Sequence, residues 1–121
     1  MFKIDSDTKQ VNLTRGDVAT FRITAKNEDG TSYQFVENDK VTLSIYEKKN
    51  LENLKLTKSV IVTTPGEYVD LTLTSTETKI DGLINKPNDY WYELVLNDEQ
   101  TLIGYDEEGA KIFRLYPEGD E

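Results

Sequence analysis

The sequence predicts an all-β protein that folds as a single antiparallel β-sandwich, with either an immunoglobulin-like or a jelly-roll-like strand order. Apolar and polar residues alternate along many short runs, which is the period of a half-buried strand. These runs are rich in Thr, Val, Ile and Tyr, and turn clusters separate them at intervals of about 8 to 12 residues. At 121 residues the chain has the size of one domain, so we expect one domain over residues 1–121.

The clearest strand is predicted over residues 40–48, KVTLSIYEK. Its apolar Val41, Leu43 and Ile45 alternate with polar or aromatic residues, so that one face packs and the other meets water. The same alternation, in longer or shorter form, marks the other predicted strands. In chain order these are residues 10–14, 17–26, 32–35, 58–63, 68–74, 90–97, 101–106 and 111–117.

Between the strands, polar clusters containing Gly, Pro, Asn or Asp predict chain reversals. They lie at residues 27–30, 37–40, 64–67, 97–100 and 106–109. Residues 75–84 are the one segment with helical character, because Ser75 or Thr76 could cap a turn that Gly82 closes. We therefore expect at most one short helical turn, and a short acidic, solvated tail over residues 117–121.

The chain contains no cysteine and no histidine. A disulfide framework and a thiolate metal site are therefore excluded, and the commonest general base and zinc ligand are missing. The sequence has no Gly-rich phosphate loop, no G-x-S-x-G nucleophile elbow and no H-E-x-x-H motif. We expect a protein that is not an enzyme, with no catalytic residues and no cofactor.

The net charge is −9, from 23 acidic and 14 basic residues. Such a chain is repelled by phosphate backbones and by anionic membrane surfaces, so neither nucleic acid nor a membrane is expected as a partner. No stretch approaches the roughly 20 apolar residues of a membrane span. The first residues, MFKIDSDTK, lack the apolar stretch of a signal peptide, which favours synthesis in the cytoplasm.

Four acidic turns allow a second interpretation as calcium ligands, because Ca²⁺ binds about six to eight oxygens. They are residues 5–7, 27–29, 97–99 and 106–108. None of them has the spacing of an EF-hand loop, and Asn and Asp are favoured in turns for their local backbone hydrogen bonds. We therefore predict solvated turns and no metal site, with calcium as the alternative.

The tripeptide Arg15-Gly16-Asp17 has the sequence by which many extracellular proteins engage integrins. Both of its flanks are predicted strands, and a chain reversal is needed between them. Gly16 supplies a positive φ at low cost, and Asp17 can hydrogen bond to nearby backbone, so the three residues suit a tight turn. We predict a turn, with an adhesin loop as the alternative.

Aromatic residues on predicted outer faces form a candidate interface. Tyr and Trp anchor many protein–protein contacts, although the same side chains can stack on sugars or simply cover a sheet. The candidates are Tyr46, Tyr68, Tyr90, Trp91 and Tyr116. We favour a protein contact and keep a carbohydrate platform as the alternative.

The order of six short stretches resembles a known class of proteins. They are V-x-L-T-R-G-D at 11–17, D-G-T-x-Y at 29–33, N-D-K-V-x-L-S-I at 38–45, P-G-E-Y at 65–68, Y-W-Y-E-L-V-L at 90–96 and G-x-K-I-F-x-L-x-P at 109–117. This pattern is similar to that of small β-sandwich modules in tailed bacteriophages and prophages of Gram-positive bacteria. The nearest named group is the N-terminal domain of the upper baseplate protein family, with related fibre and decoration modules.

The resemblance implies a non-enzymatic structural or assembly protein of a phage virion, located in a baseplate, fibre or decoration layer. Its partners would be other virion proteins or further copies of itself, in a homo-oligomer. The resemblance also favours the turn interpretation of Arg15-Gly16-Asp17, because bacterial hosts have no integrins. The alternatives are an extracellular carbohydrate-binding or adhesin module and an acidic phage-encoded inhibitor.

Overall fold

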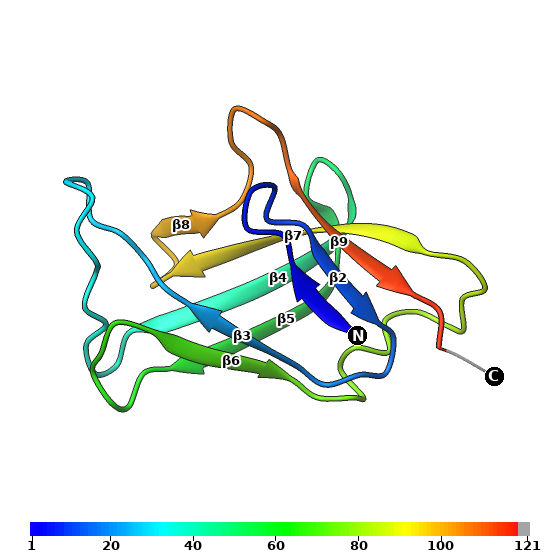
Figure 1. Ribbon diagram of the computed structural model, residues 1–121, viewed down its shortest axis with the longest axis horizontal. Helices are drawn as coiled ribbons and strands as arrows, with labels where there is room; N and C mark the ends of the chain where they lie inside the picture. The colour runs from blue at the N-terminus through cyan, green and yellow to red at the C-terminus, as the bar shows by residue number, and fades with distance from the viewer. Residues whose placement is uncertain (119–121) are drawn as a thin grey trace.

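The computed structural model describes residues 1–118, which contain nine β-strands and no helix (Figure 1). The strand bounds are β1 Phe2–Ile4, β2 Val11–Thr14, β3 Ala19–Ile23, β4 Lys40–Lys48, β5 Glu52–Ile61, β6 Val69–Leu73, β7 Asn88–Leu96, β8 Gln100–Ile103 and β9 Lys111–Tyr116. The predicted all-β class is therefore confirmed for these residues.

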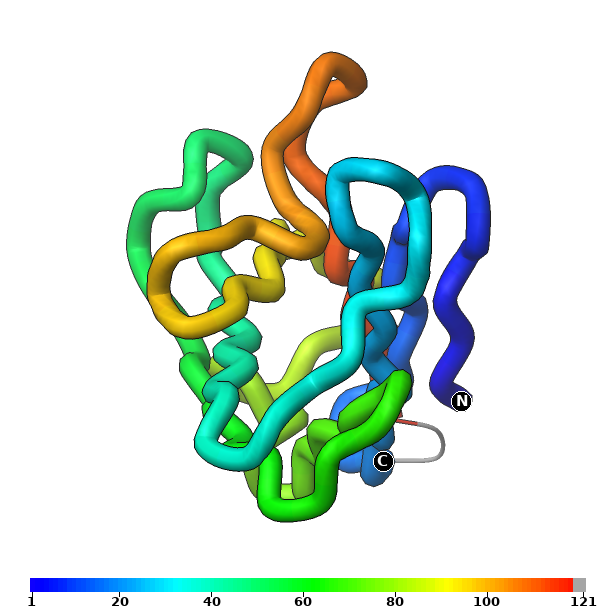
Figure 2. Tube along the Cα trace, turned by 90° about the vertical axis from the view of Figure 1, so that its left-hand side faces the viewer, coloured from blue at the N-terminus to red at the C-terminus, as the bar shows by residue number. Residues whose placement is uncertain are grey.

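Two sheets are formed. Seven strands belong to the larger sheet, in the order β1-β2-β9-β7-β4-β5, with β8 also paired to β7. The remaining two strands, β3 and β6, pair with each other as a small antiparallel sheet. In Figure 2 the larger sheet extends from the β4–β5 hairpin (green, left) round to β1 (dark blue, right).

One apolar core lies between the two sheets, and the alternation in the sequence explains why. In β4, the side chains of Val41, Leu43 and Ile45 are fully buried, while their neighbours face outward. The small sheet contributes Phe21 and Leu71 to the same core. The other buried apolar residues are Val11, Leu13, Ala19, Ile23, Phe35, Val62, Leu73, Ile80, Tyr90, Tyr92, Leu94, Leu96, Phe113 and Leu115.

The larger sheet is mixed, which corrects the prediction of a purely antiparallel fold. Strands β2 and β9 run parallel, with Val11 opposite Phe113 and Thr14 opposite Tyr116. All the other strand pairs are antiparallel. The alternation of apolar residues tells which face of a strand is buried but carries no information about the direction of its neighbour, so this pairing left no signal in the sequence.

Several predicted strand bounds also change. Residues 32–35 form only isolated bridges, between Lys26 and Ser32 and between Phe35 and Gly66, although Phe35 is fully buried. Strand β5 begins at Glu52 instead of residue 58, because a tight reversal after Lys48 lets residues 52–57 pair with β4. Strand β1 was not predicted at all, and its three residues are half-buried or exposed.

The segment after β6 is a short run of hydrogen-bonded turn, in which the Thr78 N–H donates to the Thr74 carbonyl at 3.1 Å and the Lys79 N–H donates to the Thr76 carbonyl at 3.2 Å. The cap is Thr74, not Ser75 or Thr76. Its hydroxyl accepts from the Glu77 N–H, and the Glu77 carboxylate accepts from the Thr74 N–H at 2.9 Å. This reciprocal pair is a capping box, which stabilises a helical start even when only one turn follows.

Candidate interaction surfaces

Arg15, Gly16 and Asp17 lie in a tight turn between β2 and β3. The Asp17 N–H donates to the Thr14 carbonyl at 3.0 Å, which closes the turn, and Gly16 has a φ of +90°. The Thr78 hydroxyl joins this turn to the segment after β6, because it donates to the Asp17 carbonyl at 2.8 Å and accepts from the Gly16 N–H at 3.1 Å.

The Arg15 side chain points into the protein and is only 8% exposed. Its guanidinium donates to the Asp81 carbonyl at 2.9 Å, to the Ile80 carbonyl at 3.4 Å and to the carboxylate of Glu118. The predicted solvated tail is therefore wrong at Glu118, whose side chain is largely covered by this ion pair. Residues 119–121 of that tail lie outside the described residues. An arginine held in this way is not presented to a receptor.

Replacing Gly16 with alanine is expected to destabilise the protein by about 1–2 kcal/mol, because a side chain is strained at this positive φ. A Cβ there would also lie 3.4 Å from the Lys79 side chain. Gly66→Ala is the matched control, since Gly66 lacks a positive φ and has open space around it. Urea unfolding should separate the two variants, and equal midpoints would contradict the assigned role of Gly16.

The predicted interface aromatics do not form one surface. Tyr90 is buried, which corrects its placement on an outer face: it alternates in step with Tyr92 and points into the core. Its hydroxyl donates to the Asp81 carboxylate at 2.7 Å, and burial together with this bond raises the pKa of Tyr90 to about 12. Tyr68 lies beside the small sheet, where the Arg22 guanidinium stacks over its ring at 3.9 Å.

Tyr46 and Trp91 do come together, in a row of apolar side chains across the outer face of the larger sheet. Trp91 is paired with Tyr46 on β4 and with Ile112 on β9, and a bulge in the β4–β5 pairing places Leu54 opposite Tyr46. Tyr46, Trp91 and Ile112 are partly exposed, and Leu54 is 54% exposed. We call Leu54, Tyr46, Trp91 and Ile112 the outer row.

Polar contacts border the outer row on both sides. On one side the Arg114 guanidinium forms a two-bond ion pair with Asp89, at 2.6 and 3.1 Å, which raises the pKa of Arg114. On the other side the Tyr46 hydroxyl donates to Glu93 at 3.1 Å, and burial together with this carboxylate raises the pKa of Tyr46. Tyr116 lies beyond the ion pair on β9. An apolar strip with a polar rim is the usual anatomy of a protein contact.

The acidic turns use their carboxylates locally. Asp5 accepts from the N–H groups of Asp7 and Thr8, both at 2.8 Å, and these bonds lower the pKa of Asp5. Asp106 accepts from Lys111 and from the Glu108 N–H, and both bonds lower its pKa. Within residues 1–118 no group of three or more acidic side chains is arranged to hold a metal ion.

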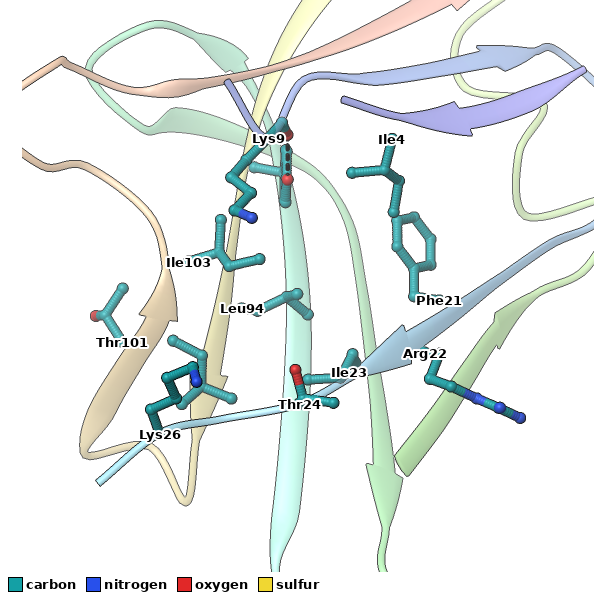
Figure 3. A pocket seen from close by; sticks show the side chains of 12 residues that line it. Ile4, Lys9, Phe21, Arg22, Ile23, Thr24, Lys26, Leu94, Thr101 and Ile103 are labelled. Carbon is teal, nitrogen blue, oxygen red and sulfur yellow. Dashed lines mark hydrogen bonds between the residues drawn. The ribbon is translucent and has the colours of Figure 1, made fainter. Parts of the chain in front are cut away.

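A groove of about 500 Å³ opens between β3 and β8 (Figure 3). Its floor is apolar and includes Leu94 and Tyr92 of β7, with Phe21 and Ile23 of β3 on one side and Ile103 of β8 on the other. The Tyr92 hydroxyl donates to the Lys9 carbonyl at the upper end, and burial raises the pKa of Tyr92. We call this the β3–β8 groove.

No sequence pattern predicts the β3–β8 groove, because its walls are about 80 residues apart along the chain and come together only in the fold. Leu54 and Ile112 of the outer row were also missed as interface candidates. Ile112 could have been found, since it alternates with buried residues and is apolar, whereas the bulge that brings Leu54 into the row has no sequence signature.

A scan of protein-family models and a search of curated proteins found no match to the chain. None of the described residues belongs to a helix long and apolar enough to cross a membrane.

Proposed function

We propose that this protein is a non-enzymatic assembly part of a bacteriophage virion, which acts through protein–protein contacts in a baseplate, fibre or decoration layer. The observation that carries the proposal is the outer row, an apolar strip with a polar rim on the uncovered face of a sheet. Its Trp and Tyr are the residue types that contribute most to protein contacts. The virion setting rests on the resemblance of the six sequence stretches.

The strand order further supports an immunoglobulin-like β-sandwich over a jelly roll. In the immunoglobulin order, strands B and E lie in one sheet, while C′, C, F and G lie in the other. Strands β3 and β6 take the places of B and E, and β5-β4-β7-β9 follow the sequence C′-C-F-G. The first two strands differ from the constant-type pattern, because β2 joins the larger sheet beside β9 and β1 pairs with the outer edge of β2.

Such an assembly protein would act through one contact that is repeated by every copy in the virion. Virion assemblies are symmetric, so one modest contact made by every copy adds up to a stable layer. The net charge of −9 would keep free copies apart until a specific contact outweighs the repulsion. The protein would be made in the bacterial cytoplasm and would pair with itself or with other virion proteins.

Trp91→Thr is expected to abolish self-assembly while leaving the fold intact, because Thr keeps the strand preference and removes the largest side chain of the outer row. Light scattering during size-exclusion chromatography, over a range of concentrations, should give a multiple of 13.9 kDa for the wild type and one copy for the variant. Leu83→Thr, at a residue 76% exposed outside the outer row, should assemble as the wild type does.

A wild-type protein that stays monomeric at every concentration would contradict self-assembly through the outer row. Trp91 is the only tryptophan, so its fluorescence reports on this surface alone. Quenching of that fluorescence by added glycans, with no change of mass, would favour a carbohydrate-binding module instead.

A further inference from the structure

We propose that the β3–β8 groove binds an extended segment of a partner protein, which pairs with the free edge of β3 as a third strand of the small sheet. The proposal rests on the assembly role above, since it names a second contact through which that role would operate. The occupant is a strand with apolar side chains at alternate positions and at least one acidic side chain. Four observations carry it.

The first observation is that β3 has a free edge. It pairs with β6 alone, over Ala19 to Ile23. In an antiparallel pair each strand uses half of its backbone groups, so the other half face the opposite edge. Among residues 1–118, the backbone of residues 18–24 makes no hydrogen bond outside this pairing. Such an edge is a template for another strand.

The second observation is that apolar residues of the larger sheet line the groove beside this edge. In Figure 3, Leu94 lies between Ile23 of β3 and Ile103 of β8. Leu94 is a core residue, and Leu102 and Ile103 are partly buried apolar residues packed against the core. A strand added to β3 would place every second side chain over these residues.

The third observation is the size of the groove. At about 500 Å³ it falls in the range of roughly 300–1,000 Å³ that suits specific ligands. It is not filled by β1, although β1 lies close by: the Phe2 ring stacks edge-on against Phe21 at 4.9 Å, and Ile4 lines the upper end. The groove therefore has room for a short strand below β1.

The fourth observation is charge. The residues that line the groove include three cations, Lys9, Arg22 and Lys26, and no carboxylate, in a chain whose net charge is −9. Arg22 is already paired with Asp70 and points away from the groove in Figure 3. The Lys9 ammonium donates to the Ser6 carbonyl, and the Lys26 ammonium has no partner among residues 1–118. These two lysines favour an acidic side chain on the occupant.

The test is a selection from displayed random linear decapeptides against the whole protein. The Thr24→Trp variant serves for counter-selection, because Thr24 is exposed at the groove and a tryptophan there would fill it. We expect enriched peptides with alternating apolar residues and Asp or Glu between them. A synthetic enriched peptide should shift the amide resonances of residues 21–24 and 101–103, and Lys26→Glu should weaken its binding at least about tenfold.

Lys49→Glu makes the same charge change in the exposed β4–β5 reversal and should leave peptide affinity within about twofold. Trp91→Thr should bind the peptide with wild-type affinity. A failure of the groove proposal can therefore be distinguished from a failure of the proposed self-assembly through the outer row. The proposal is overturned if no peptide is enriched over the filled variant, or if the resonance shifts lie elsewhere. Concentration-dependent broadening of residues 21–24 without peptide would also overturn it, by assigning the groove to a second copy.

Discussion

Arg15→Ala is expected to lower the free energy of unfolding by about 3 kcal/mol, because it leaves a mostly covered carboxylate and two backbone carbonyls without their donor. The guanidinium contacts Ile80, Asp81 and Glu118, so it joins the end of β2 to two distant segments. Urea unfolding at neutral pH measures the loss. Arg15→Lys should lie between the wild type and Arg15→Ala, because an ammonium keeps the charge without the planar fork.

Arg114→Ala is the matched control for Arg15. Arg114 also forms an ion pair with a carboxylate, but both side chains are about one-third exposed. Water screens such pairs, so the expected loss is only about 0.5 kcal/mol. If Arg15→Ala and Arg114→Ala lower the free energy of unfolding by the same amount, burial of the Arg15 ion pair does not determine its contribution to stability. An adhesin role would predict the opposite pattern, in which Arg15→Ala changes receptor binding and leaves stability unaltered.

Asp39→Asn is expected to cost about 2–3 kcal/mol at neutral pH, because an amide nitrogen would face donors that now meet a carboxylate. Asp39 is 6% exposed and accepts from the Tyr33 hydroxyl at 2.8 Å, the Val36 N–H at 3.0 Å and the Asn97 amide at 2.9 Å. Burial alone would raise the pKa of Asp39, but these three bonds together outweigh it and lower the pKa.

The contribution of Asp39 to the free energy of unfolding should decrease as the pH is lowered. A carboxyl whose pKa is lower in the folded state stabilises the fold fully above its ordinary value of 3.8, and this stabilisation is lost as the pH falls through the folded pKa. The gap in unfolding free energy between wild type and Asp39→Asn should therefore narrow on acidification. Unfolding curves at a series of pH values measure it, and a gap that widens toward acid would contradict the assignment.

The local part of the fold could be predicted from the sequence. Residues 40–48 form a strand with the predicted bounds, because strict alternation fixes both the type of element and its buried face. Residues 52–57 alternate only briefly, at Leu54 and Leu56, between polar neighbours, and the structure extends this stretch into a strand through its pairing with β4. Arg15 looked like an exposed turn residue because its partners lie 65 to 103 residues away.

For the candidate surfaces too, the sequence predicts local features, whereas features that depend on residues distant in the chain could not be predicted. Alternation placed Tyr46 and Trp91 on outward faces, and applied consistently it would have placed Tyr90 inside. What it could not supply is register, which sets Trp91 directly between Tyr46 and Ile112. The β3–β8 groove depends on how the small sheet lies against the larger one, and that placement follows from the packing of the whole core.

The parallel pairing of β2 with β9 has a consequence for how the protein is made. Val11 of β2 pairs with Phe113 of β9, so the larger sheet cannot close until β9 has left the ribosome. Closing so long a loop is slow, because its entropy is lost before the contact is gained. Until then β7 exposes the edge that β9 will cover, and such an edge invites contact with other chains. The nascent protein is therefore most vulnerable to aggregation before β9 has been synthesised.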